Sequence, residues 1–155
     1  MKIIFLDCDG VLNSSTWYAT ARSEDRDMSN HFNHIDPITV ELLNKIVEAT
    51  GAKIVITSVW RKNHLVGEIA HWLRQLGCTG EVLGATPSLP SGIRGEEIQS
   101  WLNSSRHGRA MTKMVIIDDS CDMAHLLPHL VRTSHYGGGL QQEHVDEAIR
   151  RLTAS

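Results

Sequence analysis

Five aspartates gather at two points of the chain, each time directly after a short apolar run. Asp7 and Asp9 follow the run KIIFL, and Asp118, Asp119 and Asp122 follow the run MVII. Carboxylates brought this close together repel one another, and the simplest compensation is a hard divalent cation with oxygen ligands. If the two runs are neighbouring strands, all five aspartates are candidate ligands of such a cation, for which Mg²⁺ is the best fit.

The spacing within each group indicates how its members work together. Residues two apart in an extended chain face the same way, so Asp7 and Asp9 can address one substrate. Gly10 lets the chain turn directly after them. Asp118 and Asp122 are four apart, where a strand gives way to a helix, so both can line one side of a metal site.

These groups need a framework, which the apolar pattern supplies. Short apolar runs typical of strands covered on both faces alternate with longer segments of helical periodicity. The strand-like runs are Lys2–Asp7, Lys53–Thr57, Glu81–Leu83, Met114–Asp118 and Leu130–Arg132. The helical segments are Pro37–Ala49, His64–Leu76, Gly95–Leu102, Cys121–Leu127 and Gln142–Leu152. The alternation predicts an α/β fold: a three-layer, doubly wound, Rossmann-like domain around a parallel five-stranded sheet.

Length and composition limit the possible functions. A chain of 155 residues fits one domain, spanning 1–155. Its 15 Lys and Arg against 18 Asp and Glu give a net charge of −3, with no basic run, which disfavours tight non-specific binding to nucleic acid. The apolar start Ile3–Leu6 is too short for a secretory core or a membrane span, and the three cysteines have no regular spacing. We therefore expect a cytoplasmic protein without membrane association.

Two stretches lack regular periodicity. Segment 14–35 is mostly polar, with Trp17, Tyr18 and His31 set among small polar residues, and segment 84–95 is rich in glycine and proline. Loops this long in a compact domain are usually functional lids or disordered. We expect segment 14–35 to be a polar flap that closes over bound substrate.

The order of these motifs resembles that of the haloacid dehalogenase (HAD) superfamily of phosphohydrolases. The segment Asp7-Cys8-Asp9-Gly10-Val11 is similar to the first motif of that superfamily, DxDG[VT]. Thr57 resembles the second motif, Arg94 the basic third motif, in which Lys is more usual, and the later aspartates the acidic fourth. The segments DCDGVLN, IVITSVWR, RGEEIQSWL and IIDDSCDM resemble a small group without a cap domain, and related domains occur in RNA-repair proteins.

The resemblance implies a Mg²⁺-dependent phosphatase that hydrolyses phosphomonoesters through an aspartyl-phosphate. Asp7 is the expected nucleophile, and Asp9 the expected general acid and base. The implied metal ligands are Asp7, the carbonyl of Asp9 and Asp118, with Asp119 or Asp122 as a further ligand.

Phosphate binding is expected near the end of the second strand and at the third motif. Thr57 would donate its hydroxyl to a phosphoryl oxygen, and Arg94 would balance the remaining negative charge. Ser58 is the alternative to Thr57, because a shift of one residue changes which side chain faces the site. Arg61 is the alternative phosphate contact, and Gly10 lies in the expected phosphate-binding turn.

The expected substrate is a small phosphate ester or a nucleotide, and the alternative is the 3′- or 5′-phosphate end of a polynucleotide. Nothing in the sequence indicates an obligate protein partner. A metal-dependent nuclease could also use these aspartates, but Thr57 and Arg94 would then be unexplained. A phospho-acceptor signalling domain would carry its acceptor after the third strand, where Leu83-Gly84 offers no acid.

Overall fold

The apolar runs form one parallel sheet of five strands in the order β3-β2-β1-β4-β5 in the computed structural model, which describes residues 1–155. The strands are β1 (Lys2–Leu6), β2 (Lys53–Ile56), β3 (Val82–Ala85), β4 (Lys113–Asp118) and β5 (Leu130–Arg132). All four pairings are parallel, and the central strand β1 lies between β2 and β4. The predicted doubly wound α/β fold is confirmed, and no cap domain is present. The site-bearing strands are therefore neighbours.

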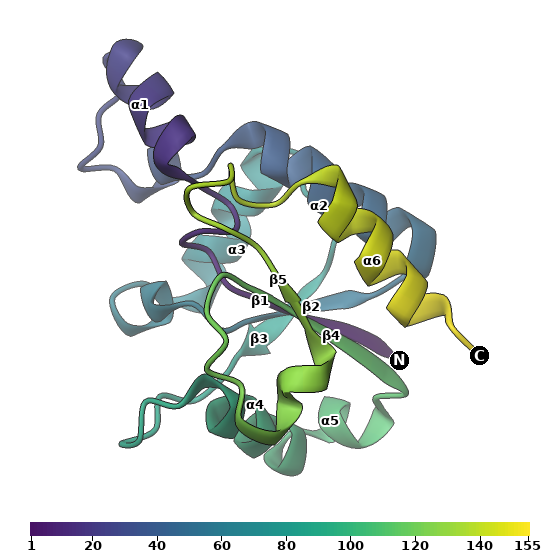
Figure 1. Ribbon diagram of the computed structural model, residues 1–155. Coiled ribbons are helices and arrows are strands. Elements are labelled where there is room, and N and C mark those ends of the chain that lie inside the picture. Colours follow the sequence, from purple (N-terminus) through teal and green to yellow (C-terminus); the bar gives the residue numbers. More distant parts are fainter.

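Helices cover both faces of this sheet. The α-helices are α1 (Ser15–Ser23), α2 (Pro37–Thr50), α3 (Val66–Gln75), α4 (Arg94–Ser104), α5 (Arg106–Ala110) and α6 (Gln142–Thr153). Short 3₁₀ segments are η1 (His31–His34), η2 (Val59–Lys62) and η3 (Ala124–His129). Figure 1 shows α2 and α6 on one face of the sheet and α4 and α5 on the other. None of the helices is both long and apolar enough to cross a bilayer.

The two layers are held to the sheet by alternate residues of the same strands. Ile4 and Leu6 of β1 join the core under α2, α3 and α6, whereas Ile3 and Phe5 join the core under α4. This alternation is the period of two expected of a strand buried on both faces. Phe5 meets Trp101 of α4 edge-on, with ring centroids 5.5 Å apart. This packing on both faces fixes the sheet that positions the residues following its strands.

Segment 14–35 is more regular than the sequence pattern indicates. It contains the nine-residue helix α1, whose N-cap Ser14 accepts a hydrogen bond from the amide of Trp17, and the 3₁₀ segment η1. Figure 1 shows α1 projecting from the domain, far from both termini. Its apolar face is narrow, with only Trp17 and Ala21 buried, so hydrophobic periodicity could not reveal it. Likewise, the helix predicted over Cys121–Leu127 is the 3₁₀ segment η3.

Candidate active site

The carboxyl ends of β1 and β4 bring three aspartates together. Asp7 directly follows β1, Asp118 ends β4, and Asp119 follows it. One carboxylate oxygen from each of the three lies within 4.8 Å of the others. We call Asp7, Asp118 and Asp119 the carboxylate trio. It forms because β1 and β4 are neighbours whose carboxyl ends meet at the same edge of the sheet.

Burial sets the electrostatics of the trio. Asp118 is fully buried and Asp7 is only 6% exposed. Burial, together with the nearby Asp7 carboxyl, raises the pKa of Asp118 to about 8, while Arg94 opposes the shift. Burial also raises the pKa of Asp7, again against the effect of Arg94. Two carboxyl groups in this surrounding need positive charge before both can ionise.

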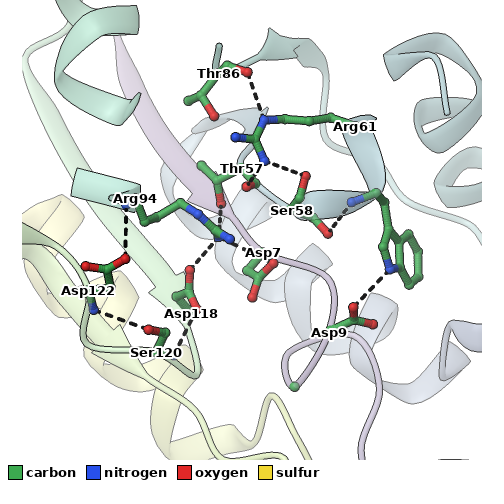
Figure 2. Close-up of polar contacts among 12 residues, drawn as sticks. Asp7, Asp9, Thr57, Ser58, Arg61, Thr86, Arg94, Asp118, Ser120 and Asp122 are labelled. Atoms are coloured by element: carbon green, nitrogen blue, oxygen red, sulfur yellow. Dashed lines mark hydrogen bonds and ion pairs between the residues drawn. The ribbon is translucent and has the colours of Figure 1, made fainter. Parts of the chain in front are cut away.

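Arg94 at the start of α4 supplies part of that charge (Figure 2). Its Nη1 lies 2.7 Å from Oδ2 of Asp118 and 3.5 Å from Oδ1 of Asp7. The same nitrogen donates to Oγ1 of Thr57 at 3.2 Å. Arg94 thus connects two aspartates and the threonine, and this brings together residues that the sequence assigned to four separate motifs.

Thr57 and Ser58 follow β2, and both are fully buried. The Thr57 hydroxyl faces Arg94, whereas Oγ of Ser58 accepts a hydrogen bond from the amide of Trp60 and caps η2. Of these two alternatives for the phosphate contact after β2, Thr57 lies beside the trio and Ser58 caps η2.

Arg61 is engaged with the protein itself. Its guanidinium and Nε groups donate to four carbonyl oxygens, those of Thr57, Ser58, Thr86 and Pro87, at 2.7–3.2 Å. Nη2 also forms an ion pair of 2.9 Å with Glu97, and both side chains are almost fully buried. Arg61 therefore connects the end of β2 to the loop after β3, and its hydrogen bonds go to these carbonyls and to Glu97 rather than to the trio.

Glu97 is a site residue that sequence analysis missed. Besides the ion pair with Arg61, it lies 3.9 Å from Nε of Arg94 and accepts a hydrogen bond from the amide of Leu89. It is only 3% exposed. The available signal was its position in the expected helix Gly95–Leu102, three residues after Arg94, because residues at that spacing are neighbours on a helix surface.

Gly10 allows the turn after β1 to pass close to Asp119. Its φ of 77° is left-handed, and a side chain there would overlap the carboxylate of Asp119. The Thr133 hydroxyl donates to the Gly10 carbonyl at 2.6 Å, which anchors the turn to the chain after β5. Gly10 is thus needed where two parts of the site approach each other.

Asp122 lies apart from the trio. Its Oδ2 accepts a hydrogen bond of 3.4 Å from the amide of Arg94, and its carbonyl accepts one from the amide of Gly95. A side chain on Gly95 would overlap the backbone of Met123, so the start of α4 and this loop are in close contact. Of the two aspartates left open by the sequence, Asp119 joins Asp7 and Asp118, and Asp122 holds the start of α4.

Asp9 has different surroundings from Asp7. Oδ1 of Asp9 accepts a hydrogen bond of 3.1 Å from Nδ2 of Asn13, and Oδ2 accepts one of 3.2 Å from the indole nitrogen of Trp60. Figure 2 shows its carboxylate apart from the pair formed by Asp7 and Asp118. Asn13 and Trp60 were also missed by sequence analysis, although each stands within a segment that carries a motif.

The donor set of the trio fits a divalent metal ion. Three carboxylates offer only hard oxygen ligands, which suit Mg²⁺, Ca²⁺ or Mn²⁺ and not a soft metal. A cation there would also lower the raised pKa values of Asp7 and Asp118. A second feature of this region is a surface cavity of about 520 Å³ lined by Asp119 together with Arg132, Thr133, Ser134, His135, Tyr136, Gly137, Glu143 and His144.

Comparison with known protein families gives a match that covers residues 3–145. The matching family is described as the HAD domain in Swiss Army Knife RNA repair proteins. The matched range runs from β1 into α6 and so includes every motif residue discussed above. No curated protein and no solved structure matches the chain.

Proposed function

The chain belongs to the family of HAD domains found in Swiss Army Knife RNA repair proteins, and from this membership and the site we propose that it is a Mg²⁺-dependent phosphatase. It hydrolyses phosphomonoesters through an aspartyl-phosphate on Asp7. The observation that carries this proposal is Arg94, whose Nη1 contacts Asp118, Asp7 and Thr57 at once. A cation-binding carboxylate trio, a hydroxyl and a guanidinium then surround one point, which suits a phosphoryl group.

In the first step, a carboxylate oxygen of Asp7 attacks phosphorus in line with the leaving oxygen. An O–P bond forms to Asp7 as the O–P bond to the leaving group breaks, and Asp9 gives its proton to the leaving oxygen. In the second step, Asp9 takes a proton from water, whose oxygen attacks phosphorus and releases Asp7. Inorganic phosphate leaves, and Asp9 is protonated again for the next substrate.

Arg94 and Thr57 bind the oxygens of the phosphoryl group during both steps. The guanidinium balances negative charge, and the Thr57 hydroxyl donates one hydrogen bond. Asp7, Asp118 and the carbonyl of Asp9, with Asp119 nearby, would hold Mg²⁺, which would supply further compensation for the charge on the phosphoryl oxygens.

Small phosphate esters, nucleotides included, are the substrate class that we favour. The net charge of −3 and the lack of a basic run argue against a long polyanion, because binding to such a polymer depends on Lys and Arg. The second candidate is the phosphorylated end of a polynucleotide. The name of the matching family, which refers to RNA repair proteins, and the absence of a cap favour this candidate.

The test is phosphate release from p-nitrophenyl phosphate with Mg²⁺ and with EDTA, using Asp7→Asn protein purified in parallel as a control for contaminating phosphatase. Metal-dependent release by the wild type alone supports the proposal. Nicking of DNA or RNA without such release would instead indicate a nuclease, and a stable phosphoprotein without turnover a phospho-acceptor domain.

Competition between substrates then distinguishes the two substrate classes. Mononucleotides, sugar phosphates and 3′- or 5′-phosphorylated oligonucleotides compete in one assay. An oligonucleotide preferred by more than about tenfold in kcat/KM, roughly 1.4 kcal/mol, would favour the polynucleotide end.

A further inference from the structure

Both carboxylate oxygens of Asp9 are occupied by donors that cannot accept a proton. Oδ1 faces the amide NH₂ of Asn13 and Oδ2 faces the indole N–H of Trp60. Trp60 comes from η2, after β2, whereas Asn13 follows β1. Two elements that are distant in sequence therefore fix one carboxylate.

The orientation of the Asn13 amide is determined by its neighbours. Its Oδ1 accepts a hydrogen bond of 2.9 Å from the amide of Gly10, so its NH₂ group must face the other way. That NH₂ group makes two contacts of 3.1 Å, one with Asp9 and one with the hydroxyl of Tyr18. Asn13 is fully buried, and every hydrogen-bonding atom of its side chain has a partner.

The hydrogen bonds continue from Asn13 into segment 14–35, and each donor in turn meets an acceptor. Tyr18 of α1 accepts from Asn13, so its own proton is free for Nδ1 of His34, 3.1 Å away. Nε2 of His34 lies 2.8 Å from the carbonyl of Met28, which can only accept. Burial and the nearby Asp9 raise the pKa of Tyr18 to about 12, which keeps the phenol protonated. The chain from Asp9 to the Met28 carbonyl therefore has a donor and an acceptor at every contact.

Trp60 is held as firmly on the other side. Trp60 is only 4% exposed, and its backbone amide donates to Oγ of Ser58. His31 of η1 meets the indole edge-on, with centroids 4.9 Å apart, and Trp72 of α3 packs at 6.4 Å. Segment 14–35 thus supports both partners of Asp9, through Tyr18 on one side and His31 on the other.

We propose that Asn13, Trp60, Tyr18 and His34 are positioning residues that aim the proton of Asp9 at the leaving oxygen of the substrate. Because Asn13 and Trp60 present only N–H groups to Asp9, a protonated Asp9 finds no acceptor in either of them. Neither neighbour can take up its proton, which stays available to the leaving oxygen. Segment 14–35 acts on catalysis by holding the general acid, a role separate from covering the substrate.

This inference rests on the proposed phosphatase activity, and a series of aryl phosphates tests it. Phenyl, p-chlorophenyl and p-nitrophenyl phosphate have nearly the same size, but their leaving groups differ in basicity. Protonation by Asp9 matters most for phenyl phosphate and least for p-nitrophenyl phosphate. The value of kcat/KM includes only the steps up to the aspartyl-phosphate, so the phenyl to p-nitrophenyl ratio of kcat/KM reports the general acid.

The variants are Trp60→Phe and Tyr18→Phe, each of which removes one polar group and keeps an aromatic ring. The expected decrease of the ratio is about tenfold for Trp60→Phe, which loses a direct contact, and about threefold for Tyr18→Phe. Asp9→Asn, measured by the single-turnover release of the phenol, gives the largest decrease and calibrates the scale. Tyr18→Phe, which loses only a hydroxyl, keeps the test valid if Trp60→Phe folds poorly.

Trp17→Phe is the matched control. Trp17 lies in the same helix as Tyr18, and its indole nitrogen donates to the carbonyl of Asn33, outside the chain that leads to Asp9. It is expected to leave the ratio unchanged even if overall activity falls. A ratio within about twofold of the wild type in folded Trp60→Phe and Tyr18→Phe would overturn the inference while leaving the phosphatase proposal intact. If the wild type cleaves none of the three esters, both proposals are wrong.

Discussion

Asp7 and Asp9 are the same residue type, two positions apart, yet their surroundings are opposite. Asp7 is buried among charged groups: Asp118, Asp119 and the guanidinium of Arg94. Asp9 lies among neutral donors and aromatic rings. The charged surroundings of Asp7 suit a nucleophile that shares a cation, and the neutral surroundings of Asp9 suit a group that gives and takes a proton. Environment, not residue type, separates the two roles.

The largest effect is expected from replacing each of the two carboxyl groups by an amide, in separate variants. Asp7→Asn removes the nucleophile and should lower kcat by at least about a thousandfold, and it should also abolish trapping of beryllium fluoride as an acyl-phosphate mimic. Asp9→Asn should also lose turnover but still bind beryllium fluoride, because the acceptor oxygen of Asp7 remains. Kinetics and fluorine NMR measure the two properties. Near-normal activity of Asp7→Asn would remove the covalent mechanism.

Removing a charged group near Arg94 and Asp7 should also cost more stability than removing a neutral donor of Asp9. Glu97→Gln leaves the almost fully buried Arg61 without its ionic partner and should lower the free energy of unfolding by about 3 kcal/mol. Trp60→Phe, which removes a donor of Asp9, should lower the free energy of unfolding by roughly half as much, because it loses one hydrogen bond and some packing. Urea denaturation monitored by circular dichroism measures both. Equal losses would show that the ion pair contributes no more than the indole.

The metal requirement should distinguish the aspartates at the end of β4. Asp118→Ala should raise the Mg²⁺ concentration for half-maximal activity by about tenfold or more, since it removes a trio member. Asp122→Ala should leave that concentration unchanged, because Asp122 contacts the start of α4. Mg²⁺ titrations of p-nitrophenyl phosphate hydrolysis provide the measurement. Unchanged metal dependence in Asp118→Ala would move the ligand role to Asp119.

The last expected effect is a dependence of the free energy of unfolding on pH. The pKa of Asp118 is raised to about 8, so the folded protein holds a proton there that the unfolded chain releases near pH 4. This group therefore stabilises the metal-free fold least above pH 8, and its contribution falls as the pH rises from about 4 to about 8. Asp118→Asn has no such proton, so the stability of the variant relative to the wild type should rise as the pH rises over this range.

Melting curves at several pH values in EDTA measure this difference. Mg²⁺ should reduce it, because a bound cation stabilises the ionised wild-type site and not the variant. A difference between the two proteins that stays constant from pH 5 to pH 8 would show that Asp118 is ionised throughout.

Much of the fold could be predicted because its signals are local in the sequence. The five strands appear as short apolar runs, and α2 begins at Pro37 and ends before Gly51, as its caps predict. The helix α1 was missed because only two of its residues are buried. Its stability comes from contacts such as that between Trp17 and Asn33, which no periodicity encodes.

The same division holds within the site. The sequence by itself determined the offset of Asp7 and Asp9 and the turn at Gly10, since these depend on the geometry of a few consecutive residues. Only the tertiary structure decided between Asp119 and Asp122, turned Arg61 toward carbonyl oxygens, and brought Asn13 and Trp60 to Asp9. These contacts join segments that are far apart along the chain or that point in directions set by packing. Their geometry depends on strand order and side-chain packing, which are properties of the whole fold.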